Sequence, residues 1–188
     1  MNRLLLIIDA QEDFLEGSLR MEGATERMDR LAEYIQNHDG QYQVKVFTKD
    51  WHPLNHCSFQ CNGGPWPIHC LNHSAGAGIH QSLLIAAYST KGDTVVLTKG
   101  DNPQKEEYSI FDNEASSARL RQIVDEYAID QIDVCGVARE YCVKESILGA
   151  IKVFGPDRLC LLDRYIGAIS DDHALDEIVE AYHLRLES

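Results

Sequence analysis

Short apolar runs that end at chemically active residues are the feature that most constrains the fold of this chain. The first run is Leu4-Leu5-Leu6-Ile7-Ile8, and it ends in Asp9. A continuous apolar run of this length is typical of a strand covered on both faces, as in a parallel sheet. Further strand-like segments lie at residues 44–48, 94–98, 132–137 and 159–162.

Segments with helical spacing separate these runs. Residues 25–37 place apolar side chains at positions 28, 31, 32 and 35, which is the spacing of one helix face. Helices are also expected over residues 79–88, 114–127, 141–154 and 172–183, and a short terminal strand over 184–186. This alternation predicts an α/β fold: a doubly wound, mostly parallel sheet with helices on both faces, in a single domain over residues 1–188.

The amino-acid composition disfavours some classes of binding partner. The chain carries 17 basic and 30 acidic side chains, which gives a net charge of −13 and a surface that repels phosphate backbones. We therefore expect no nucleic-acid partner, and no membrane partner because no apolar stretch approaches the length of a span. Neither a Walker A loop nor a GxGxxG follows a strand, which disfavours nucleotide binding. The N-terminus lacks a signal-peptide pattern, so we expect a cytoplasmic protein. The sequence leaves open whether the protein forms a homo-oligomer.

The strand ends carry the candidate catalytic groups, because sites in such sheets lie outside the carboxyl ends of the strands. Asp9 and Lys99 follow two of the apolar runs, and Cys142 follows a third at the start of a helix. A helix N-terminus and a nearby ammonium are expected to lower the pKa of this thiol and favour a thiolate nucleophile. Asp9 would accept the thiol proton, and backbone N–H groups of the turn at 137–142 would form an oxyanion hole.

A second group of residues predicts a divalent metal site. Asp50 and His52 follow the strand at 44–48, and residues two apart on a strand share one face. His56 is expected to fold back beside them, and His69 is a further nitrogen donor. One carboxylate and several imidazoles at a strand end suit a divalent ion with open positions for water. The alternative is that these are scattered surface histidines.

Three cysteines, Cys57, Cys61 and Cys70, interleave with histidines in the same region. Two interpretations stay open for them, a structural zinc site or a Cys61–Cys70 disulfide, although the spacing matches no standard zinc pattern. A non-catalytic zinc-binding module built on this region is therefore an alternative to an enzyme. In such a module, replacing Cys142 would leave the function intact.

Taken together, the motifs resemble the isochorismatase-like cysteine hydrolases, and within them the nicotinamidases. The resemblance covers residues 3–165 and rests on Asp9-Ala10-Gln11-Glu12-Asp13-Phe14, the segment with Asp50, His52 and His56, Lys99, and Gly136-Val137-Ala138-Arg139-Glu140-Tyr141-Cys142-Val143. It implies an amidohydrolase that converts nicotinamide to nicotinate and ammonia through a cysteine thioester. A small-molecule amide would be the substrate, and no organic cofactor would be needed.

The resemblance also implies roles for individual residues. Asp9, Lys99 and Cys142 would form the catalytic triad as acid/base, electrostatic support and nucleophile. The Val137–Ala138 peptide would be cis, with the N–H groups of Ala138 and Cys142 as the oxyanion hole.

Binding roles follow from the same resemblance. The metal ligands would be Asp50, His52, His56 and His69. The ion would be zinc in the first place, or manganese or iron, and it would hold the pyridine nitrogen and orient the ring. Phe14 and Trp66 would flank the ring, with ordinary core packing as their alternative role.

One residue pair departs from the family pattern, and two related activities are alternatives to a nicotinamidase. Arg139-Glu140 stands where the family often carries Thr-Asp, so Arg139 is expected to lie close to the site and alter substrate access or charge. Another amidase of the superfamily, acting on an N-carbamoyl compound or a ureidoacrylate, is the main alternative, and the metal histidines argue against it. A true isochorismatase is disfavoured because Cys142 would be superfluous.

Overall fold

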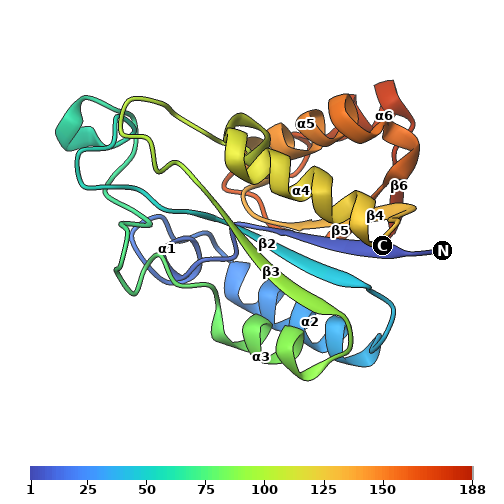
Figure 1. Ribbon diagram of the computed structural model, residues 1–188. Helices are drawn as coiled ribbons and strands as arrows, with labels where there is room; N and C mark the ends of the chain where they lie inside the picture. The colour runs from blue at the N-terminus through green and yellow to red at the C-terminus, as the bar shows by residue number, and fades with distance from the viewer. Residues whose placement is uncertain (188) are drawn as a thin grey trace.

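A computed structural model describes residues 1–187 of the chain. Within these residues the strands form one parallel sheet in the order β3-β2-β1-β4-β5-β6 (Figure 1). The strands are β1 (Arg3–Ile8), β2 (Val44–Asp50), β3 (Asp93–Lys99), β4 (Gln131–Gly136), β5 (Leu159–Ile166) and β6 (Arg185–Glu187). From β1, the chain adds β2 and β3 on one side of the sheet and then β4, β5 and β6 on the other, which confirms the predicted doubly wound arrangement.

Helices cover both faces of this sheet (Figure 1). One face carries α2 (Ala24–Asn37) and α3 (Gln81–Ser89), and the other carries α4 (Glu114–Glu126), α5 (Lys144–Phe154) and α6 (Asp176–Tyr182). A single further turn, α1 (Glu12–Leu15), follows β1. No helix within residues 1–187 combines the length and the apolar composition that crossing a bilayer requires.

The position of β1 explains its uninterrupted apolar sequence. Leu5 and Ile7 pack into the layer under α2 and α3, whereas Leu4, Leu6 and Ile8 pack into the layer under α4 and α5. All five side chains are fully buried. Burying a side chain of this size contributes about 1.5–3 kcal/mol, so the central strand stabilises both halves of the core.

Several boundaries differ from the sequence prediction. β2 and β5 continue beyond the predicted ends, to Asp50 and Ile166, so that both strands reach the edge of the sheet where the candidate residues lie. The last helix begins at Asp176 rather than at residue 172, because the carboxylate of Asp171 accepts the N–H of His173 and favours a turn. The turn α1 is too short to show a period in the sequence.

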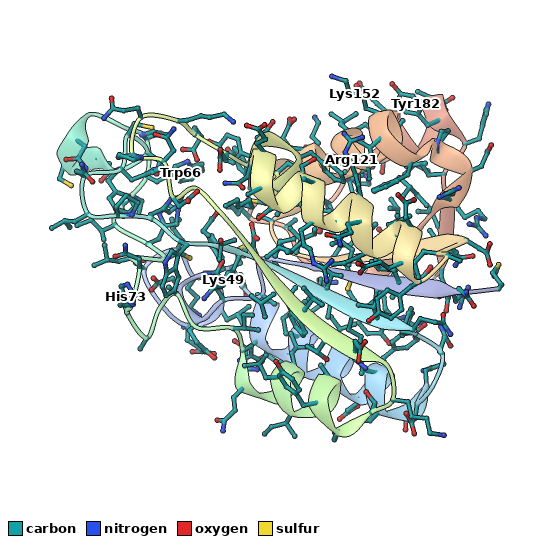
Figure 2. All side chains as sticks on the ribbon, in the orientation of Figure 1. Lys49, Trp66, His73, Arg121, Lys152 and Tyr182 are labelled. Carbon is teal, nitrogen blue, oxygen red and sulfur yellow. The ribbon has the colours of Figure 1, made fainter. Side chains whose placement is uncertain are left out.

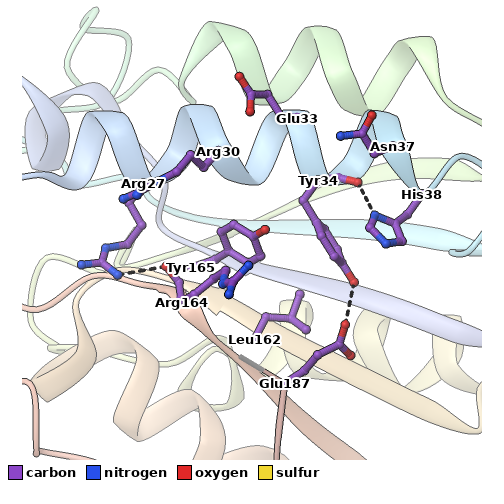
Figure 3. A pocket seen from close by; sticks show the side chains of 10 residues that line it. All are labelled: Arg27, Arg30, Glu33, Tyr34, Asn37, His38, Leu162, Arg164, Tyr165 and Glu187. Atoms are coloured by element: carbon purple, nitrogen blue, oxygen red, sulfur yellow. Dashed lines mark hydrogen bonds between the residues drawn. The ribbon is translucent and has the colours of Figure 1, made fainter.

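A wide cavity of about 710 Å³ lies between α2 and β5, and Figure 3 shows the side chains around it. Arg27 Nη1 donates to the carbonyl of Arg164 at 2.9 Å, and the Tyr34 hydroxyl donates to Glu187 at 3.3 Å. None of the residues predicted for catalysis or metal binding lines this cavity. Its size alone therefore does not mark it as the catalytic pocket.

His80 joins three helices on the face that carries α2 and α3. It precedes α3, and its Nδ1 lies 3.0 Å from Glu12 on α1 while its Nε2 lies 3.0 Å from Asp29 on α2. Only the protonated imidazole donates from both nitrogens. Burial opposes the charge, but the hydrogen bonds to Asp29 and Glu12 outweigh it and raise the pKa of His80 above its usual value.

The stability of the fold should therefore depend on pH through His80. A pKa raised by folding contributes stability that is complete below the unfolded value of about 6.5 and is lost as pH rises through the folded value. We expect His80→Gln to lower the melting temperature by about 2 °C at pH 5.5, and by less at pH 9. Differential scanning calorimetry across this range measures the effect. His38→Gln is the control, and a His80→Gln difference that stays constant with pH would contradict the prediction.

Candidate active site

Three neighbouring strands bring Asp9, Asp50 and Lys99 together. Asp50 and Lys99 are register partners at the ends of β2 and β3, and Asp9 follows β1 beside them. Lys99 Nζ lies 2.8 Å from Asp9 Oδ2 and 2.5 Å from Asp50 Oδ1. Burial opposes the charge of Lys99, but the two carboxylates outweigh it and hold its pKa well above the usual value.

Cys142 reaches this cluster from the next strand of the sheet. β4 leads through a cis Val137–Ala138 peptide, as the family resemblance implied, into a π-turn over Arg139–Val143 that continues into α5. Cys142 Sγ lies 3.6 Å from Lys99 Nζ, and it falls within 4.8 Å of carboxylate oxygens of Asp9 and Asp50. Single π-turns that are continuous with an α-helix are frequent at functional sites.

The expectation of a lowered thiol pKa is wrong for this environment. Cys142 is only 7% exposed, and burial raises the pKa of its thiol well above the usual value. Lys99 acts in the opposite direction, but Asp9 and Asp50 add to the effect of burial. Burial therefore favours the protonated thiol, and a nucleophilic Cys142 would need a proton acceptor such as Asp9.

Two polar residues that the sequence analysis did not assign hold the carboxylates in place. The Thr48 hydroxyl donates to Asp9 Oδ1 at 2.7 Å. The Gln11 side chain accepts the N–H of Asp50 at 2.7 Å and donates to its carbonyl at 2.9 Å. Burial raises the pKa of Asp9, although Lys99 opposes this effect. Thr48 lies two positions before Asp50 on β2, so strand periodicity was the signal for Thr48. Gln11 lies beyond the end of β1, where no strand period marks it.

The predicted metal donors lie beside this cluster in two overlapping groups. Asp50, His52 and His69 place ligand atoms within 4.8 Å of one another, and so do His52, His56 and Glu106. Burial lowers the pKa of both His56 and His69, which favours the neutral imidazole that binds a metal.

The surroundings of the histidines fit a divalent cation. The Nδ1 atoms of His52 and His69 lie 2.9 Å and 2.8 Å from backbone carbonyls, so the Nε2 atoms are free to act as ligands. Outer contacts of this kind orient metal-binding histidines in many proteins. His56 is held in the same way, with Nδ1 2.8 Å from the Ser58 hydroxyl, but its Nε2 lies 3.1 Å from the carbonyl of Lys105.

Glu106 is a donor that sequence reasoning missed. It lies in the loop after β3, and burial raises the pKa of its carboxyl, to which the charge of Asp50 adds. Its neighbours Lys105 and Glu107 are also charged, so the sequence resembles an ordinary exposed loop. Only the folding of this loop against His52 and His56 reveals its position.

Aromatic side chains enclose a narrow pocket above Cys142. The lining includes Phe14, Leu19, Asp50, Trp66, His69, Glu106, Tyr108, Ala138, Tyr141, Cys142 and Ile169. Trp66 meets Tyr141 edge-to-face at 5.1 Å, and its indole N–H donates to the Tyr108 hydroxyl at 3.1 Å. Figure 2 places Trp66 in the loops beyond the carboxyl ends of β2 and β3. A slot between aromatic side chains, with polar groups at one end, suits a small flat ring.

Arg139 does not take the position expected from the sequence. Its guanidinium points away from the pocket, with Nη1 2.9 Å from Asp163 Oδ1 and Nη2 donating to the carbonyl of Ile166 at 3.3 Å. It is not among the pocket-lining residues. The expectation that Arg139 alters substrate access or charge is therefore not supported, because the end of β5 offers its side chain better partners.

The interleaved cysteines do not assemble into a site. Cys57, Cys61 and Cys70 are free thiols, and Cys61 is exposed whereas Cys70 is buried. Within the described part of the chain, none of the three joins a group of metal-ligand atoms. Neither the Cys61–Cys70 disulfide nor the structural zinc site is present, and the Cys70 N–H instead donates to Asp13 at 2.7 Å.

Comparisons with known proteins agree with this geometry. The family model described as Isochorismatase domain matches residues 3–153. A nicotinamidase of Escherichia coli (strain K12) is 31% identical over 172 residues, covering 80% of this chain and 77% of that protein.

Solved structures add to the agreement. A pyrazinamidase of Pyrococcus horikoshii in complex with zinc has a TM-score of 0.82 at 29% identity, covering 100% of this chain and 99% of that one. PnC1 from L. infantum, in complex with nicotinate, has a TM-score of 0.84 at 32% identity, covering 100% and 92%. These matches show that the chain belongs to the isochorismatase family.

Proposed function

We propose that this protein is a nicotinamidase, an amidohydrolase that converts nicotinamide to nicotinate and ammonia. One observation carries the proposal: Cys142, which contacts the buried Lys99–Asp9 pair, lines an aromatic pocket together with the metal donors Asp50 and His69. A planar pyridine carboxamide has a ring for the aromatic walls, a ring nitrogen for the polar end and an amide for the thiol. Relatives that bind nicotinate or are named nicotinamidases support this assignment.

The first half of the reaction is attack by Cys142. As Sγ bonds to the carboxamide carbon, the thiol proton passes to Asp9, whose carboxylate lies within 4.8 Å. The N–H groups of Ala138 and Cys142 would stabilise the oxyanion, and a donor of this kind contributes about 3–4 kcal/mol. Asp9 then gives its proton to the leaving nitrogen, so the C–N bond breaks with release of ammonia and formation of a thioester.

The second half regenerates the enzyme. Asp9, now ionised, takes a proton from water as the water attacks the thioester carbon. The C–S bond breaks, the proton returns to the Cys142 sulfur, and nicotinate leaves. Lys99 stays charged throughout, because it lies 2.8 Å from Asp9 and 2.5 Å from Asp50. Burial raises the pKa of Asp9, which suits a carboxyl group that must carry a proton between the two halves.

Asp50, His52, His56 and His69 would hold a divalent cation, with zinc preferred over manganese or iron. When bound, the cation would hold the pyridine nitrogen and so orient the ring. Asp50 offers one oxygen to Lys99, at 2.5 Å, and its other oxygen lies 3.7 Å from His52 Nε2, so it couples the metal donors to the catalytic lysine. Phe14 and Trp66, which both line the pocket, would flank the ring.

The nucleophile is tested by replacing it. We expect metal-replete protein to release ammonia from nicotinamide, and Cys142→Ala to lower the rate by about 1,000-fold or more, because no thioester can form. Cys61→Ala is the matched control, since this cysteine is exposed and outside the pocket, and its rate should equal that of the wild type. A coupled glutamate dehydrogenase assay measures ammonia directly. Equal rates for wild type and Cys142→Ala would eliminate the proposed mechanism.

The metal site is tested by binding rather than by activity alone. We expect chelator-treated protein to take up one zinc ion per chain, measured by isothermal titration calorimetry and elemental analysis. His69→Ala should weaken this binding by about 100-fold, because even outer-shell contacts to a metal are worth 10–100-fold. His173→Ala is the control, because His173 is exposed and pairs only with Asp176. Unchanged affinity in His69→Ala would remove this residue from the ligand set.

A further inference from the structure

We propose that Glu140 is a positioning residue: its carboxylate holds the segment Ile169–Asp171 in place as one wall of the pocket, and it thereby sets the affinity for the amide substrate. The inference builds on the proposed nicotinamidase function and adds a specificity element to the same site. Glu140 has no role in the catalytic steps or in the metal site described above.

The contacts of Glu140 are unusually concentrated. Its Oε1 accepts the N–H groups of Ser170 at 2.6 Å and Asp171 at 2.8 Å, and its Oε2 accepts the N–H of Ile169 at 3.0 Å. One carboxylate thus satisfies three consecutive backbone amides. Hydrogen bonds to an ionised acceptor are about twice as strong as neutral ones. Burial opposes the charge of Glu140, but these amides outweigh it and hold its pKa below the usual value.

The segment held by Glu140 has no regular structure of its own. It lies between the end of β5 at Ile166 and the start of α6 at Asp176. Its first residues are tied to the nucleophile turn by backbone bonds, from the Arg139 N–H to the Gly167 carbonyl at 2.8 Å and from the Gly167 N–H to the Gly136 carbonyl at 2.9 Å. Glu140 is the side chain of the same turn that extends this attachment to residues 169–171.

The segment matters to the pocket through Ile169. Its side chain lines the pocket together with Ala138 and Cys142, yet it is 47% exposed, so it lies at the mouth. An apolar side chain at the mouth contacts a bound ring but none of the atoms that react. Displacing Ile169 should weaken the binding of the substrate and of the transition state equally. KM should therefore rise while kcat stays nearly unchanged.

A double-mutant cycle tests this role. Glu140→Gln keeps the size of the side chain but replaces one accepting oxygen by an NH₂ group. We expect it to raise the KM for nicotinamide about tenfold, with kcat changed by less than about twofold. Ile169→Ala should have a similar effect, and the double variant should be no worse than either single one, because both remove the same wall.

The control is Glu177→Gln, which removes the same charge from an exposed position on α6 and should leave KM unchanged. Fully additive effects of Glu140→Gln and Ile169→Ala would overturn the inference. So would a fall in kcat with an unchanged KM in Glu140→Gln.

Amide hydrogen exchange separates this inference from the proposed function, because it needs no substrate. In the wild type, the amides of Ile169, Ser170 and Asp171 should exchange about tenfold or more slowly than the same segment in Glu140→Gln, while the strands of the core exchange equally in both. Wild-type amides that exchange as fast as an unstructured peptide would overturn the tether even if nicotinamide were not the substrate. If the wild type releases no ammonia from nicotinamide but the tether is present, the substrate assignment fails and the positioning role of Glu140 stands.

Discussion

The site depends on one buried ion cluster, in which the ammonium of Lys99 lies between the carboxylates of Asp9 and Asp50. Lys99 is fully buried, so its charge is stable only because two anions lie 2.8 Å and 2.5 Å away. The cluster joins the ends of three strands and contacts the thiol of Cys142, which lies in the turn after a fourth strand, β4. Removing the lysine would leave two uncompensated carboxylates, a change that typically costs about 3–5 kcal/mol. The charges to which we assign catalytic roles therefore also hold the framework of the site together.

Much of the fold and of the site was predictable because the decisive signals are local. The apolar run before Asp9 predicted a strand covered on both faces, and its alternation with helical segments predicted the doubly wound sheet. Once the strands are parallel, the topology itself places Asp9, Lys99 and Cys142 at one edge. Asp50 and His52 lie at the end of β2 for the same reason, whereas His69 reaches them because the long loop folds back and pairs Leu71 with His52.

The parts that could not be predicted depend on contacts between distant segments or on burial. Glu106 looks like a loop residue until its loop folds over His52, and Arg139 turns away because the end of β5 offers it a carboxylate. The predicted direction of the pKa shift of Cys142 was wrong. The sequence shows the helix start and the lysine, which lower the pKa of the thiol, but it does not show the burial that raises this pKa by more. The cysteines of the long loop suggested a zinc site from composition alone, and their side chains do not meet.

The place of β1 at the centre of the sheet has a consequence for how such enzymes diversify. The loop after β2 supplies histidine donors and Trp66, whereas the turn after β4 supplies the thiol and Tyr141, and these two strands flank β1 on opposite sides. The two segments still meet across the pocket, where Trp66 packs edge-to-face against Tyr141, so a substitution in one changes the surroundings of the other. A change of shape in residues 51–80 therefore has to be matched in the turn at residues 137–143 if the aromatic walls of the pocket are to stay in contact.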